Sequence, residues 1–377
     1  MIDGSRSLRS TLNRFALTCV VVVVSMEFAV RFDDALRFGD SVWSRVRSTE
    51  DLVVRDGTGF HGRPLARYNQ FRYNNLGMRG PDADSLKPSG VFRVITVGAS
   101  ETHGLYESEG MEFPRQLEDT LREIWSTNEC IRGRTATERV EVLNAAIVGM
   151  TMPKAIQSLR LRMRYFDPDV VVYYPTPAQY LYEELPSARA PDSLAGDPPL
   201  PVSNALRPRL PGRFRDQLKG LLPAVVLDWL RQRDIDRVRA SHPSEWRFPD
   251  VPLERVEAFE RDLRSLVAAI DSVGAEPVLV THANAFVGQS SPDRGALRAW
   301  ERFYPKATGE MIIRFDALAN ESVREVAWGG GITLADAEVV FGGVDTDVFA
   351  DFSHFTDVGA GIQAHLIGRA IAESACR

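Results

Sequence analysis

The chain has 377 residues, of which 44% are hydrophobic and 25% are charged. These proportions are typical of a folded globular protein and exclude a disordered, collagen-like or disulfide-rich scaffold. The formal net charge is −6, so the chain lacks the overall positive field that draws proteins onto nucleic acid. We therefore expect no nucleic-acid partner.

A hydrophobic segment lies near the N-terminus, at residues 15–30, and three arginines precede it. Such a basic flank is expected to stay in the cytoplasm while the following chain crosses the membrane. The segment is short for a bilayer, about 24 Å as a helix, but no clean signal-peptidase site follows it. We predict a single-pass signal anchor within residues 1–34 and an extracytoplasmic body. A buried strand or helix made from residues 20–24 is the alternative.

Residues 35–90 are polar and turn-rich and are expected to form a lead-in segment packed on the body. From there on, short apolar runs alternate with amphipathic stretches. Such alternation predicts a parallel sheet flanked by helices. Strands are expected at residues 92–98, 140–149, 169–174, 276–283 and 332–340, and helices at residues 113–125, 153–165, 253–273 and 361–374.

An insertion interrupts this pattern at about residues 186–252, which hold 11 of the 22 prolines. Within it, residues 218–230 have apolar side chains at helical spacing, with Pro223 as a kink or a start. We expect a lid, a membrane-facing helix or a helix packed on the body.

In open parallel sheets, ligands bind beyond the carboxyl ends of the strands. After the first strand comes Ser100, whose hydroxyl is a candidate nucleophile and whose amide is a candidate oxyanion donor. A serine in such a turn can also be a simple capping residue.

A second candidate segment lies near the C-terminus, where Asp351 precedes His354 by three residues. The histidine can act as a general base, and the aspartate can fold back to hold its Nδ1–H. The same aspartate can instead only close a turn, while Thr356 or Asp357 caps the following helix.

These segments together resemble the SGNH, or GDSL-type, hydrolases. Ser100 in VGASETHG matches the nucleophile of that family, Gly149 in NAAIVGMT its oxyanion glycine, and DFSHFTDVG its C-terminal D-x-x-H with Asp351 and His354. The resemblance implies a flavodoxin-like three-layer α/β/α sandwich with a central parallel sheet over residues 91–377. It also implies a serine esterase with a Ser100, His354 and Asp351 triad.

Two positions depart from the family pattern. Ala99 replaces the aspartate of the GDS motif, which is not the nucleophile. The third block, at residues 175–180, lacks the asparagine that donates to the oxyanion, so the amides of Ser100 and Gly149 would have to suffice, or Gln179 or Thr176 would replace it.

Other polar residues at strand ends are His103, Asn144, His282 and Asn284. The two histidines could contact a ligand, but we expect them to be structural, because Asp351 and His354 already fill the role of base.

We expect no cofactor and no metal site. Cys19 lies in the apolar segment, and Cys130 and Cys376 could pair in an oxidising compartment.

The expected function is a membrane-anchored esterase that removes an O-acyl group, most plausibly acetyl, from an extracytoplasmic glycan or a similar ester. Its partners would be that acylated substrate, the membrane and the envelope polysaccharide machinery. The alternatives are a glycan O-acyltransferase and a non-catalytic binding or assembly protein with a degenerate site.

Overall fold

The computed structural model describes residues 3–46, 48–127, 139–187, 209–212, 214, 221–289, 292–344 and 347–376. Cys130 and much of the insertion lie outside these ranges, whereas Cys376 is disulfide-bonded.

A five-stranded parallel sheet forms the centre of the body, in the order β6-β5-β7-β8-β9. Its strands are β5 (Val91–Gly98), β6 (Arg139–Asn144), β7 (Val170–Tyr174), β8 (Glu276–Val280) and β9 (Thr333–Ala335). This is the flavodoxin-like strand order 2-1-3-4-5. The predicted fold class, a flavodoxin-like three-layer α/β/α sandwich with a central parallel sheet, is confirmed.

The sheet is apolar on both faces because helices cover both. Along β7, Val171 and Tyr173 enter one hydrophobic core, while Val170, Val172 and Tyr174 enter the other. Period-two alternation sends successive side chains to opposite faces, and β-branched residues suit a strand buried on both sides.

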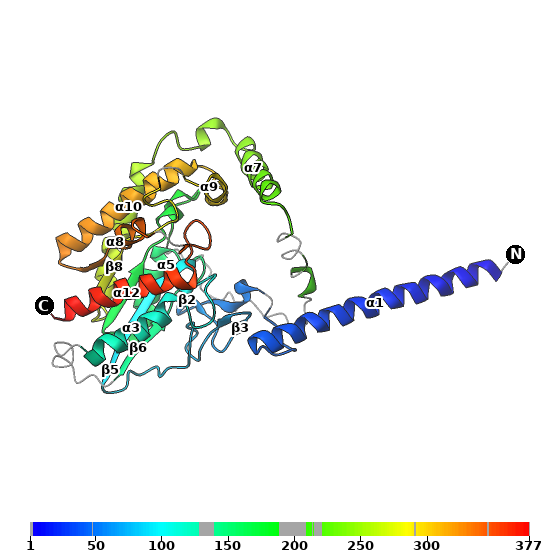
Figure 1. Ribbon diagram of the computed structural model, residues 1–377, viewed down its shortest axis with the longest axis horizontal. Coiled ribbons are helices and arrows are strands. Elements are labelled where there is room, and N and C mark those ends of the chain that lie inside the picture. The colour runs from blue at the N-terminus through cyan, green and yellow to red at the C-terminus, as the bar shows by residue number, and fades with distance from the viewer. Residues whose placement is uncertain are drawn as a thin grey trace.

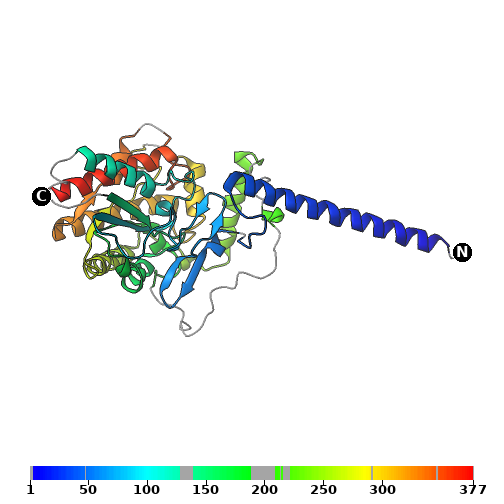
Figure 2. The same ribbon diagram turned by 90° about the horizontal axis from the view of Figure 1, so that it is seen from below.

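Two layers of helices complete the sandwich (Figures 1 and 2). The first core includes residues of α5 (Met152–Leu161), α8 (Leu253–Asp271) and α10 (Gly309–Gly330); the second includes residues of α3 (Phe113–Thr127), α11 (Ala337–Gly342) and α12 (Asp357–Ala375). A helix pairs its apolar stripe with one face of the sheet. Because the helices cover the two faces of the sheet, the edge formed by the carboxyl ends of the strands is left free to carry a site.

The lead-in segment forms two small antiparallel pairs, β1 (Val53–Asp56) with β2 (Gly59–Gly62) and β3 (Arg67–Tyr68) with β4 (Phe71–Arg72), after a short helix, η1 (Thr49–Leu52). Phe60, Phe71 and Tyr73 belong to the same hydrophobic core as Ile95 of β5. The lead-in thus shares a core with the sheet.

The N-terminal helix α1 (Asp3–Phe38) extends away from the body (Figures 1 and 2). Its stretch Leu12–Phe38 is long and apolar enough to cross a membrane, as a signal sequence near an N-terminus also would be. The anchor stays a prediction.

One acidic side chain of the apolar segment is held by the insertion. Glu27 accepts hydrogen bonds from the backbone amides of Arg209 and Leu210. The buried guanidinium of Arg209 in turn pairs with Asp34 and Asp40 at 2.7 Å. Contacts with the insertion therefore pair the acidic side chains of Glu27 and Asp34 in this helix.

Farther along, the insertion forms α7 (Ala224–Ala240), which starts directly after Pro223, and η4 (Ser244–Trp246). Proline suits the start of a helix because it has no amide hydrogen to lose there. Arg298 of α9 (Arg294–Glu301) pairs with Asp228 of α7. The insertion helix thus packs on the body through charged contacts.

The boundaries of several predicted elements differ. The strand expected at residues 332–340 is only the three-residue β9, because the chain turns at Asp336 into α11. The helix expected at residues 153–165 divides into α5 and η2 (Met163–Phe166). The 22-residue α10, capped by the Thr308 hydroxyl, was not predicted.

Candidate active site

Ser100 is the first residue of the short helix α2 (Ser100–His103), directly beyond the carboxyl end of β5. The turn before it is tight: a Cβ on Gly98 would lie 2.1 Å from the Thr102 hydroxyl oxygen. Only glycine fits so close an approach. The local sequence therefore places the serine at the end of the central strand, where the sheet leaves room for a ligand.

The loop before α12 presents His354. An isolated antiparallel bridge joins Phe349 to Phe355 and closes the loop at its base, and the Thr356 hydroxyl caps α12. Within the loop, Asp351 Oδ1 accepts hydrogen bonds from the amides of Ser353 and His354. Both carboxylate oxygens of Asp351 also lie 2.9 Å from His354 Nδ1. The aspartate closes the turn and orients the imidazole at once.

The surroundings of His354 favour its protonated form. Burial alone would lower the pKa of this histidine, but the hydrogen bond to Asp351 and the charges of Glu101, Asp351 and Glu107 outweigh it, so the pKa is raised. An imidazole must be neutral to accept a proton from serine. Any activity that uses His354 as base should therefore rise with pH through a value above the usual 6.5.

A cavity of about 420 Å³ brings the predicted site residues together: Ser100, Gly149, Thr176, Gln179, Asp351 and His354 all line it. Its remaining walls are largely aromatic, with Tyr106, Tyr182, Trp300, Phe303, Tyr304 and Phe352, and they include two basic residues, Arg231 and Arg302. Arg231 belongs to α7, so the insertion forms part of this wall.

Ser100 and His354 share the cavity but are not hydrogen-bonded. Ser100 Oγ donates to Glu101 at 3.2 Å, and His354 Nε2 has no hydrogen-bond partner among the described residues. Catalytic contacts are often long before substrate binds. The serine hydroxyl would turn from Glu101 to His354 to be activated.

Two backbone amides are available for an oxyanion. Within the described part of the chain, neither the Ser100 nor the Gly149 amide donates to another protein group. Gly149 has φ +77°, in the left-handed region, and no atom lies within 4 Å of a Cβ built there. Glycine is favoured at this position by backbone conformation and not by lack of space.

The two replacement donors of the third block have other partners. Thr176 Oγ1 donates its only hydrogen to Glu101 at 3.0 Å. Gln179 lies in η3 (Pro177–Leu181). Its side-chain amide donates through Nε2 to the Met150 carbonyl at 3.1 Å. The oxyanion position therefore depends mainly on Ser100 and Gly149.

Gly149→Ala is expected to lower ester hydrolysis about 10- to 100-fold, because an alanine resists the left-handed conformation and would turn the amide from the oxyanion. Gly274→Ala is the matched control, since Gly274 has φ +82°, equally open surroundings, and lies outside the cavity. Both variants should lose about 1 kcal/mol of unfolding free energy. Equal activity of the two variants, measured as kcat/KM on p-nitrophenyl acetate, would argue against Gly149 as a donor.

Sequence reasoning missed a buried acidic and basic network beside Ser100. Glu101, which is two per cent exposed, and His282 both line the cavity. His282 Nδ1 lies 2.9 Å from Asp316, and Asn284 also donates to Asp316. Asp316 comes from the unpredicted α10, so no local sequence signal pointed to it.

The other two strand-end residues lie outside the cavity. His103 is buried, with Nε2 at 2.7 Å from the Tyr73 hydroxyl, and burial lowers its pKa well below the usual value. Asn144 donates to the Thr102 carbonyl and accepts from the Ala146 amide. Both hold the nucleophile turn against its neighbours.

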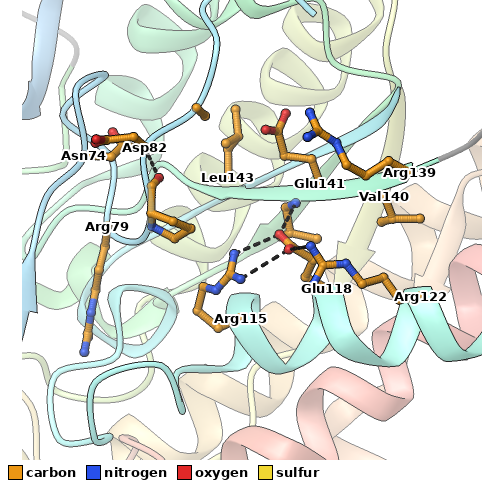
Figure 3. A pocket seen from close by; sticks show the side chains of 13 residues that line it. Asn74, Arg79, Asp82, Arg115, Glu118, Arg122, Arg139, Val140, Glu141 and Leu143 are labelled. Atoms are coloured by element: carbon orange, nitrogen blue, oxygen red, sulfur yellow. Dashed lines mark hydrogen bonds and ion pairs between the residues drawn. The ribbon is translucent and has the colours of Figure 1, made fainter. Parts of the chain in front are cut away.

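A separate, smaller cavity of about 140 Å³ lies beside β6 (Figure 3). Its charged side chains are largely paired: Glu118 accepts hydrogen bonds from Arg115 and from the Val142 amide and forms an ion pair with Arg122. It contains neither a serine nor a histidine among its lining residues. This cavity offers no nucleophile.

No protein-family model and no curated protein matches the sequence. Solved structures that are similar include a lipase/acylhydrolase from Enterococcus faecalis, with 17% identity over 75% of this chain and 96% of that one and a TM-score of 0.41. An acetylxylan esterase from Geobacillus stearothermophilus has 13% identity, 77% and 95% coverage and a TM-score of 0.40. A GDSL-like lipase from Bacteroides thetaiotaomicron has 11% identity, 75% and 87% coverage and a TM-score of 0.36.

These structures are described as lipases and esterases, the classes that the sequence resemblance implies. At identities below 20% and TM-scores below 0.5 they carry no argument about the chemistry of this chain. The reaction must be argued from the site itself.

Proposed function

We propose that the protein is a serine esterase that removes an O-acyl group, most plausibly acetyl, from an extracytoplasmic glycan or a similar ester. The observation that carries the proposal is the shared cavity, which holds Ser100, the Gly149 amide and the paired Asp351 and His354. A nucleophile, an oriented base and oxyanion donors are the parts that acyl transfer requires.

The mechanism follows from these positions. Ser100 Oγ attacks the ester carbonyl while His354 Nε2 takes its proton, and Asp351 stabilises the imidazolium that forms. The amides of Ser100 and Gly149 hold the oxyanion. The imidazolium then protonates the leaving alcohol, and water, activated by the same histidine, releases the acid from the acyl-enzyme.

The glycan substrate is supported by the walls of the cavity. Aromatic residues such as Trp300 and Tyr304 line the cavity together with Arg231 and Arg302, so flat apolar surfaces and hydrogen-bond donors belong to the same walls. A sugar has apolar ring faces and a rim of hydroxyl groups, so it fits such walls. In the described structure, no side chain adds a third hydrogen-bond donor to the two oxyanion amides. This favours the alternative, a binding protein that has lost catalysis.

The extracytoplasmic location is supported by three features. The helix α1 is long and apolar enough to serve as an anchor, and three arginines precede the apolar segment. Cys376 is disulfide-bonded, and disulfides persist in oxidising compartments.

A charged, membrane-impermeant fluorophosphonate tests reaction and topology together. On intact cells that express the full chain, it is expected to form one covalent adduct, detected by intact mass. Ser100→Ala should abolish the adduct, and Ser272→Ala, at the distant end of α8, should leave it unchanged. An adduct formed only after lysis would overturn the topology. No adduct before or after lysis, on folded protein, would overturn the esterase and favour the binding protein.

A further inference from the structure

Glu101 joins three segments of the site through hydroxyl groups. Its carboxylate accepts hydrogen bonds from Ser100 Oγ at 3.2 Å, from Thr176 Oγ1 at 3.0 Å and from Ser353 Oγ at 3.2 Å. These donors come from the nucleophile turn, the end of β7 and the loop of His354. The carboxylate therefore contacts both the nucleophile and the loop that carries the base, and the proposed mechanism assigns it no role.

A buried carboxylate needs a compensating charge. His282 Nε2 lies 3.9 Å from Glu101 Oε1, too far for a hydrogen bond but close enough for an ion pair. On its other side, His282 Nδ1 lies 2.9 Å from Asp316. Asn320 holds the backbone of His282, accepting from its amide and donating to its carbonyl. A second histidine and carboxylate pair is thus built behind Glu101.

The charges of this network are consistent with its geometry. Burial would raise the pKa of Glu101, but the interactions with His282 and the charge of His354 outweigh it, so the pKa is lowered. Burial would lower the pKa of His282, but Asp316 and Glu101 together raise it. Glu101 is therefore an anion and His282 a cation near neutral pH.

We propose that Glu101, held as an anion by His282 and Asp316, is a positioning residue that orients the Ser100 hydroxyl and sets the pH range in which His354 acts as base. The inference rests on the proposed esterase function and deepens it. Before substrate binds, Glu101 holds the serine hydroxyl; when the hydroxyl turns to His354, the anion stabilises the imidazolium beside it, together with Asp351.

Other groups that face His354 must be separated from this effect. Asp351 contacts its Nδ1, the ring of Tyr106 packs edge-on at 5.2 Å, and Glu107 is a buried carboxyl close enough to affect it. Burial raises the pKa of Glu107 to about 7, so this group titrates in the same range. A Glu107→Gln arm therefore accompanies the test.

The experiment measures the rate of fluorophosphonate labelling of the full chain in mild detergent between pH 5 and pH 9. The wild-type rate should rise with pH, with a midpoint above 6.5. Glu101→Gln should move the midpoint down by about one unit, because it removes a negative charge near the imidazolium, and lower the plateau about tenfold. Glu101→Asp keeps the charge and should restore the midpoint.

His282→Asn tests the second pair without changing a group that touches Ser100. Glu101 should then take up a proton, and the midpoint should fall as in Glu101→Gln. Glu118→Gln is the control, because Glu118 is equally buried but lies in α3, in the separate cavity; it should lose stability and keep the midpoint.

An unchanged midpoint in folded Glu101→Gln, or a shift that appears only in Glu107→Gln, would overturn the inference and leave the esterase standing. A wild-type chain that fails to label would overturn both. If Glu101→Gln does not fold, His282→Asn carries the same decision, and an unchanged midpoint in that variant would overturn the inference.

Discussion

His354→Ala is expected to lower kcat/KM for p-nitrophenyl acetate by on the order of 10⁴- to 10⁶-fold. The reason is that, in the described structure, His354 lines the cavity with its Nδ1 held by Asp351 and its Nε2 free of hydrogen-bond partners. His282, the other histidine in the cavity, is closed in between Asp316 and Glu101. Without His354 the group beside Ser100 Oγ is the Glu101 carboxylate, whose lowered pKa makes it a poor base for the serine proton.

A smaller loss is expected for Asp351→Asn, on the order of 10³- to 10⁴-fold, since the imidazole stays in place but loses its stabilising charge. His365→Ala is the matched control, because His365 is exposed on α12 outside the cavity, and its activity should equal that of the wild type. Retention of more than a tenth of the activity in His354→Ala would exclude it as the base.

Arg93→Met is expected to lower the unfolding free energy by about 3–5 kcal/mol. The Arg93 side chain is fully buried at the start of β5. It pairs with Glu141 of β6 at 2.7 Å and donates to the backbone carbonyls of Asp84 and Phe166. It thus joins the lead-in segment to two neighbouring strands.

Methionine nearly preserves the volume, so the loss would come from the unpaired carboxylate and carbonyls and not from a cavity. Urea unfolding of the full chain in mild detergent, followed by circular dichroism, measures the change. Arg237→Met, at an exposed position on α7, should change the free energy by less than about 0.5 kcal/mol. A similarly small change in Arg93→Met would show that the lead-in is not held by this side chain.

Much of the fold was predictable because the relevant signals are local. The run at residues 169–174 is apolar and β-branched throughout, which indicated a strand buried on both faces, and β7 is such a strand. The short strand β9 was overextended because Asp336 turns the chain into a helix whose residues are equally apolar. Periodicity over so few residues cannot separate a strand from a helix.

The candidate site also has a part that local sequence predicts and a part that it does not predict. Ser100, Asp351 and His354 could be proposed from motifs, because a D-x-x-H spacing lets the aspartate reach the histidine within one turn. The roles of Thr176 and Gln179 could not, since their hydrogen bonds go to Glu101 and Met150, which are distant in sequence. A donor's availability depends on what packs against it.

The sequence by itself determined the alternation of strands with helices, the apolar N-terminal segment and the candidate nucleophile and base. These follow from local propensity, hydrophobic period and short motifs. Only the tertiary structure decided that Glu101 accepts hydrogen bonds from Thr176 and Ser353 and that His282 stands between Glu101 and Asp316. The physical reason is burial: a charge acquires its partners when β5, β8 and α10 pack together, and no spacing along the chain records which charges will meet.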